Sequence, residues 1–108
     1  MSQETRSAWT IEEVEATVAD YIAMLSAELS GSAYSKSDHR RSLLPTLQRR
    51  SEQSVEYKYA NISAILIELG FPYISGYKPR SNYQRLLQEV VSERLESNAT
   101  LLQLVAAD

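Results

Sequence analysis

The sequence predicts an all-α fold: a compact bundle of about four to five helices, with a helix-turn-helix-like middle and a loop rich in glycine, proline and tyrosine. Apolar residues recur every three or four positions through most of the chain, as in helices that bury one face. Residues that start or stop helices bracket these stretches, among them Thr10, Gly31 and Gly70. The 108 residues suit one domain, which can bury roughly two thirds of its unfolded surface.

The first helix is predicted between Thr10 and Gly31. Thr10 can cap its N-terminus, and Glu13 stands three residues later to complete a capping box. Gly31 is suited to end the helix, because glycine tolerates the left-handed conformation found there. The predicted buried face consists of Ile11, Val14, Val18, Tyr21, Ile22, Leu25 and Leu29.

A short second helix is predicted next. Either Ser35 or Ser37 can cap it, and leucines at positions 43, 44 and 47 give it a short buried stripe. Pro45 interrupts the pattern, so we expect this helix to kink or to restart there.

The third helix is predicted to begin after Ser51 or Ser54 and to run to Leu69. A glycine and a proline follow and end it. A short helix, a tight connection and a longer helix form the outline of a helix-turn-helix arrangement.

Residues 70–80 are predicted to form a loop, with a possible very short strand at Tyr73–Ile74. Ser81 is predicted to cap a fourth helix, with Gln84 at the capping-box position. The apolar tail after Asn98 predicts a final helix or the start of a connection to another domain. We expect the inward stripes to form one core that includes Val14, Val18, Leu25, Ile62, Leu66, Leu69, Leu87 and Val90.

The net charge of −3 is unevenly distributed. Residues 1–35 sum to −5, residues 36–85 to +5 and residues 86–108 to −3. A basic middle between acidic ends suggests an anionic partner for the middle. The alternative is that the segments neutralise one another within the fold.

Several kinds of site are excluded or disfavoured by composition. The chain has no cysteine, which excludes a disulfide framework and a thiolate metal site. The lone His39 cannot build a zinc site, and no nucleophile-elbow motif or phosphate-cradling glycine loop is present. We therefore expect no catalytic centre, no metal and no cofactor. No apolar run approaches the ~20 residues that cross a bilayer, and the N-terminus is unlike a signal peptide, so we expect a cytoplasmic protein without membrane contact.

The basic middle also holds the side chains suited to nucleic acid. Arginine and lysine neutralise phosphates, asparagine offers the donor and acceptor that adenine recognition requires, and tyrosine can stack on a base. Asn61 could instead cap a loop, and tyrosines are common at half-buried positions. The candidate nucleic-acid-binding residues are Lys36, Arg40, Arg41, Arg49, Arg50, Tyr57, Lys58, Asn61, Tyr77, Lys78 and Arg80.

Three stretches resemble a known type of bacterial domain. They are WTIEEVEATVADY at 9–21, RSEQSVEYKYANISA at 50–64 and ISGYKPRSNYQ at 74–84. Together they resemble an N-terminal helical domain found ahead of HNH-type nuclease domains and other restriction-related modules, over roughly Trp9 to Leu95. The resemblance implies a DNA-sensing or DNA-positioning role beside a separate catalytic domain. This chain lacks an HNH-like histidine cluster, so it would be the recognition part alone.

We therefore expect residues 1–97 to form a helical DNA-binding domain, and 98–108 a terminal helix or a linker toward a fused nuclease domain. The alternative is a helical protein-interaction or dimerisation module that uses the acidic first helix or the apolar tail. A small hydrolase has the least support. DNA binding requires the basic residues to share one surface, whereas a scattered or internally paired arrangement favours the interaction module. The residues concerned are Arg40, Arg41, Arg49, Arg50, Lys58, Lys78 and Arg80.

Overall fold

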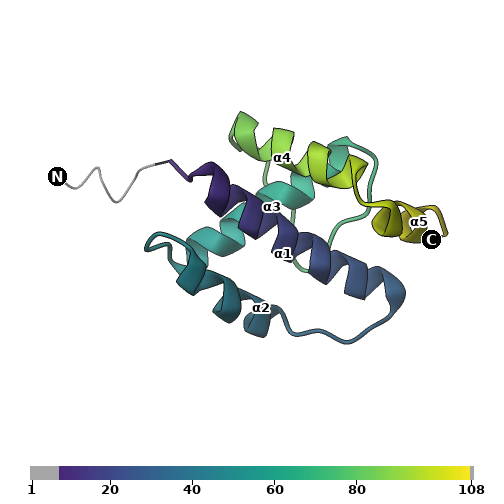
Figure 1. The fold of residues 1–108 in the computed structure, drawn as a ribbon, viewed down its shortest axis with the longest axis horizontal. Helices are drawn as coiled ribbons and strands as arrows, with labels where there is room; N and C mark the ends of the chain where they lie inside the picture. Colours follow the sequence, from purple (N-terminus) through teal and green to yellow (C-terminus); the bar gives the residue numbers. More distant parts are fainter. Residues whose placement is uncertain (1–7, 108) are drawn as a thin grey trace.

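A computed structural model describes residues 8–107, which fold into five α-helices and one short 3-10 helix, with no strand among them (Figure 1). The predicted all-α bundle of four to five helices is confirmed. The ends of the predicted domain range, 1–7 and 108, lie outside the described residues. The elements are α1 (Ile11–Ser30), α2 (Lys36–Leu43), η2 (Leu44–Thr46), α3 (Glu52–Glu68), α4 (Arg85–Glu96) and α5 (Ala99–Ala107).

Helix α1 is the centre of the bundle, because it packs against each of the other four α-helices. In Figure 1, α4 lies on one side of α1 and α2 on the other. Helix α3 packs on both α1 and α4, and α5 packs on the same two helices. The predicted apolar tail forms helix α5, and its Leu101 is fully buried in the core.

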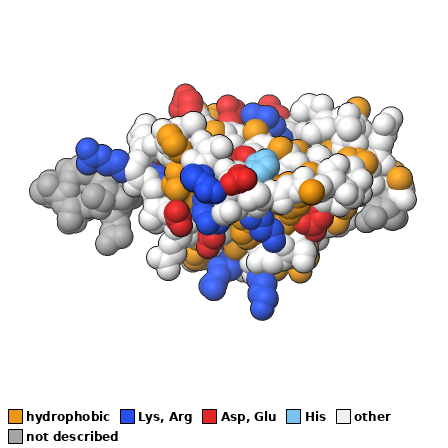
Figure 2. Space-filling model, turned by 90° about the horizontal axis from the view of Figure 1, so that it is seen from below, with side chains coloured by type: hydrophobic (Ala, Val, Ile, Leu, Met, Phe, Trp, Pro, Cys, Tyr) orange, Lys and Arg blue, Asp and Glu red, His pale blue; other side chains and the backbone are white. Residues whose placement is uncertain are grey.

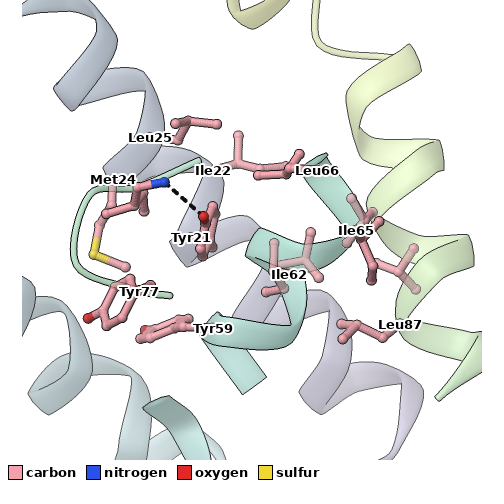
Figure 3. Packing of buried hydrophobic residues seen from close by; sticks show 14 of the residues in the cluster. Tyr21, Ile22, Met24, Leu25, Tyr59, Ile62, Ile65, Leu66, Tyr77 and Leu87 are labelled. Atoms are coloured by element: carbon pink, nitrogen blue, oxygen red, sulfur yellow. Dashed lines mark hydrogen bonds between the residues drawn. The ribbon is translucent and has the colours of Figure 1, made fainter. Parts of the chain in front are cut away.

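The core lies where α1, α3 and α4 meet. Figure 3 shows Tyr21 and Leu25 of α1 facing Ile62 and Leu66 of α3, with Leu87 of α4 beside them. All five side chains are fully buried, as is expected for apolar residues on inward helical stripes.

Leu69 was predicted to lie in the core, and this prediction is wrong, because its side chain is 40% exposed. Helix α3 ends one residue earlier, and Gly70 then takes the left-handed conformation with φ 81°. The Phe71 N–H donates to the Leu66 carbonyl at 2.8 Å, which closes the end of the helix. The turn brings the half-buried Phe71 against the core, and Leu69 is left outside.

The helix starts follow local capping chemistry. Thr10 and Glu13 form the predicted capping box at α1. Ser35 caps α2 and Ser51 caps α3, so in both cases the first of the two predicted serines is the cap. Helix α2 ends at Leu43 and continues directly as the 3-10 helix η2, with Pro45 in the first turn of η2, so the helix tightens near Pro45 without a break.

The loop between α3 and α4 is anchored by buried side chains, and it forms no strand at Tyr73–Ile74. The Ile74 N–H donates to the Tyr21 hydroxyl at 3.0 Å, the hydrogen bond drawn in Figure 3. The buried Tyr77 ring lies 4.9 Å from the Tyr59 ring, centroid to centroid. The segment contacts side chains of α1 and α3, and no extended backbone of the described residues lies beside it with which a strand could pair.

The predicted cap at Ser81 is wrong. Gln84 occupies the N-cap position of α4, and no side chain caps that helix. The preceding residues run along α3: the Arg80 N–H donates to the Ala60 carbonyl at 3.1 Å, and the Asn61 amide donates to the Arg80 carbonyl. These contacts hold the chain outside helical geometry until Gln84.

The middle of the fold follows the predicted order of a short helix, a connection and a longer helix. The connection spans residues 44–51, whereas a helix-turn-helix joins its helices by three to four residues. Moreover, residues 58–66 of α3 are all buried. Only the first turns of α3 and its last two residues, Ile67 and Glu68, are therefore accessible, and most of this helix cannot lie in a DNA groove.

Candidate nucleic-acid interface

The arginines of α2 are paired with carboxylates of the same chain. Arg40 donates to Glu56 at 2.8 Å, and Arg41 donates to Asp38 at 2.6 Å. Figure 2, which looks onto the molecule from the side of α2, shows Lys and Arg side chains interspersed with Asp and Glu. The charges of this face offset one another, so it is not a uniformly positive surface.

Arg50 is part of an internal ion pair. Its guanidinium donates to Glu13 at 2.8 Å, and the two side chains are 9% and 3% exposed. The hydrogen bond from Arg50 is the main cause that lowers the pKa of Glu13 to about 2. Glu13 also accepts from the Gln48 N–H at 2.8 Å. The pair ties α1 to the segment before α3, which is a structural role.

Lys58 and Asn61 lie inside the molecule. The Lys58 ammonium is 4.7 Å from the centre of the Trp9 ring and donates to the Gln84 amide oxygen at 3.2 Å. Burial is the main cause that lowers the pKa of Lys58, and the charge of Arg50 adds to it. Asn61 is 2% exposed, and its amide holds the Arg80 carbonyl.

Tyr77 and Lys36 fasten the loop to α2. The Lys36 ammonium donates to the Ser75 carbonyl and lies 5.0 Å from the centre of the Tyr77 ring. The Tyr77 hydroxyl is buried without a hydrogen-bond partner among residues 8–107. Burial raises the pKa of this hydroxyl.

Four of the eleven predicted residues are exposed without an ion pair in the described part of the chain, and three of these lie together. Tyr57, Lys78 and Arg80 line a groove of about 500 Å³ between α3 and the loop. The Arg80 guanidinium lies 5.7 Å from the centre of the Tyr57 ring. The fourth, Arg49, stands apart before α3 with φ 56°. Of the seven basic residues expected to share one surface, only Lys78 and Arg80 line this smaller groove.

A second hollow of about 430 Å³ adjoins the groove, and Gln53 and Tyr57 line both. Among the described residues that line it, none is Asp or Glu. Its walls combine three aromatic rings, four side-chain amides, two serines and one lysine. They are Trp9, Tyr57, Tyr83, Gln53, Asn61, Asn82, Gln84, Ser51, Ser54 and Lys58. We call this the aromatic hollow.

Seven of the ten residues that line the aromatic hollow are not among the candidate residues predicted from the sequence: Trp9, Ser51, Gln53, Ser54, Asn82, Tyr83 and Gln84. The available signal is the run Asn82-Tyr83-Gln84, a tyrosine between two side-chain amides, which begins two residues after Arg80. Because Ser81 and Gln84 have the spacing of a capping box, this run predicts the start of a helix instead.

His39 belongs to a separate structural network. Its Nδ1 lies 2.7 Å from the Asp20 carboxylate, which also accepts from the Tyr59 hydroxyl. The network joins α2, α1 and α3. No group of three or more His, Cys, Asp or Glu residues within 8–107 is placed to hold a metal ion.

Comparisons with known proteins give no information on the function of this chain. No family model, curated protein or solved structure matches this chain. The resemblance to HNH-associated domains stays a prediction. Within the described residues, none of the helices has the length and apolar character needed to cross a membrane.

Proposed function

We propose that this chain is a DNA-binding module that contacts the phosphate backbone through the groove between α3 and the α3–α4 loop. The observation that carries the proposal is the convergence of Tyr57, Lys78 and Arg80 beside the aromatic hollow. Two cations next to a lining of rings and amides offer what nucleic acid needs: charge for phosphates, and flat or hydrogen-bonding surfaces for bases.

The local charge favours an anion at the groove. Glu56 is the carboxylate that lines it, and Arg40 holds this group at 2.8 Å, which offsets its charge. Lys78 and Arg80 are exposed and face solvent. A phosphate that approaches the groove therefore meets two cations whose charge the neighbouring carboxylate does not cancel.

The finer proposal is that the chain serves as the recognition part of a restriction- or defence-type nuclease in the cytoplasm. It rests on the resemblance of the three sequence stretches to HNH-associated domains. In this proposal the chain binds duplex DNA, and a fused domain carries out the cleavage.

The test is a set of fluorescence-anisotropy titrations of labelled plain and methylated duplexes at several salt concentrations. Each phosphate contact should contribute ~0.9 to the slope of log affinity against log salt. Lys78→Ala combined with Arg80→Ala should weaken binding to all sequences alike and reduce the slope by ~2. The Arg80 contacts to Ala60 and Asn61 use backbone atoms on the Arg80 side, so this variant should stay folded.

The matched control is Arg94→Ala, which removes an exposed cation from the last turn of α4. It should leave both the affinity and the salt slope unchanged. Absence of salt-dependent binding to any duplex or single strand at micromolar protein would overturn the proposal. Equal affinities for wild type and the double variant would overturn the assignment to the groove.

The alternative, a helical interaction module, is favoured by a different surface. Leu69 and Leu102 are both about 40% exposed and line a mainly apolar hollow of about 370 Å³ with Phe71 and Leu95. Exposed apolar side chains that lie together are typical of protein contacts. A concentration-dependent dimer in light scattering that Leu102→Glu abolishes, together with no DNA binding, would favour this function.

A further inference from the structure

We propose that the aromatic hollow receives a single unstacked base of the bound DNA. This inference rests on the proposed DNA binding and adds to it a site for one base, formed by Trp9, Tyr57 and Tyr83. The neighbouring groove would hold the phosphate of the same strand.

The three rings give the hollow the surfaces on which a base stacks. Trp9 precedes α1, Tyr57 lies in the exposed second turn of α3, and Tyr83 precedes α4, so three separate segments bring their rings to one place. The cations of Arg50 and Lys58 both lie within 5 Å of the centre of the Trp9 ring and keep it in position. Every base has a flat π face, so this arrangement suits bases in general.

The side-chain amides supply the hydrogen-bonding groups that an unpaired base exposes. Gln53 and Asn82 line the hollow, and neither side chain hydrogen-bonds to another residue of the described part. Each amide offers a donor and an acceptor side by side, the pattern that matches the edge of a base. The lining holds no described carboxylate that would repel the adjoining phosphate.

Tyr57 joins the two parts of the site, because it lines the hollow and also lies beneath the Arg80 guanidinium. A nucleotide placed across Tyr57 would have its phosphate toward Arg80 and Lys78 and its base toward Trp9. A base inside a paired duplex cannot enter such a hollow, so the nucleotide must leave the stack. Sites where unpairing is easy should therefore be preferred.

The experiment uses three DNA duplexes of one sequence: fully paired, with one bulged base, and with an abasic residue at the bulge. Trp9 is the only tryptophan of the chain, so its fluorescence reports directly on stacking in the hollow. The bulged base should quench this fluorescence and raise the affinity about tenfold over the paired duplex. The abasic bulge, which has the same flexible backbone, should do neither.

Two variants at the rim locate the effect without disturbing the core. Tyr57→Ala and Asn82→Ala change exposed side chains and keep the Trp9 reporter. Each should remove most of the preference for the bulged base while the salt slope is retained. Tyr73→Ala removes an exposed tyrosine that does not line the hollow and should leave the preference intact.

The outcomes separate the two proposals. Equal, salt-dependent binding of all three duplexes without quenching would overturn the base site and leave DNA binding standing. An equal gain from the base and abasic bulges would also overturn it, because flexibility alone would then explain the preference. Absence of binding to every duplex would overturn both.

Discussion

Glu13→Gln is the substitution whose consequence the structure defines best. The Glu13 carboxylate is 3% exposed and accepts five hydrogen bonds: from the Thr10 N–H at 3.0 Å and hydroxyl at 3.5 Å, the Gln48 N–H at 2.8 Å, and Arg50 at 3.0 and 2.8 Å. Glutamine has the same shape, but it removes the charge and brings an NH₂ group into a site where only donors converge. The Arg50 guanidinium would keep its buried place without a counter-charge.

The expected cost follows from the pKa of Glu13. Folding lowers this pKa from 4.5 to about 2, and each unit corresponds to ~1.4 kcal/mol of differential stabilisation. The charged form of Glu13 therefore contributes about 3 kcal/mol to the free energy of unfolding at pH 7. Breaking a buried ion pair from one side typically costs a similar ~3–5 kcal/mol.

The sign of the pH dependence follows from the same shift. A lowered folded-state pKa gives stability that is complete above pH ~5 and is lost as the pH falls toward 2. Urea denaturation followed by circular dichroism should show the variant about 3 kcal/mol less stable at pH 7, with the gap closing near pH 2. Arg41→Gln breaks an exposed pair with Asp38 and should cost less than ~1 kcal/mol. A Glu13→Gln protein as stable as wild type at pH 7 would refute the reasoning.

Two further predictions concern packing and backbone conformation. Leu101→Ala should cost ~2–5 kcal/mol in chemical denaturation, close to the effect of Leu66→Ala in α3, because both side chains are fully buried; a loss under ~1 kcal/mol for Leu101→Ala alone would mean that α5 is not part of the cooperative core. Arg49 adopts φ 56°, a left-handed conformation that costs a non-glycine residue ~1–2 kcal/mol. Glycine avoids this cost but gains conformational freedom in the unfolded chain, so Arg49→Gly should raise the thermal midpoint only slightly. A clear fall in the midpoint would contradict the second prediction.

Helix positions were predictable because their signals are local. The capping box at Thr10 and the stop at Gly31 act within one turn of the chain, and both are found as predicted. Ser81 carried an equally good local signal, yet the long-range contacts of Arg80 to α3 override it. Leu69 fitted the periodic stripe but fell beyond the helix end.

The candidate site was harder to predict, since charge counting says nothing about partners distant in sequence. The middle of the chain does carry a net positive charge. However, Arg50 pairs with Glu13, 37 residues away in the sequence, and Arg40 pairs with Glu56, 16 residues away. The Arg50–Glu13 pair follows the alternative in which the charged segments offset each other, whereas Arg40 and Glu56 both lie within the basic middle. The convergence of Trp9 with Tyr83 depends on tertiary packing that no local pattern encodes.

The anchoring of the α3–α4 loop has a consequence for the thermodynamics of association. Ile74 and Tyr77 are buried, and the Arg80 backbone is paired with α3, so contacts within the chain itself fix the shape of the loop. Ordering a flexible side chain at an interface costs ~0.5–1.5 kcal/mol, and a mobile backbone adds more. In the proposed DNA binding, the backbone of this loop would therefore need no ordering, and the ordering cost would fall on exposed side chains such as Lys78 and Arg80.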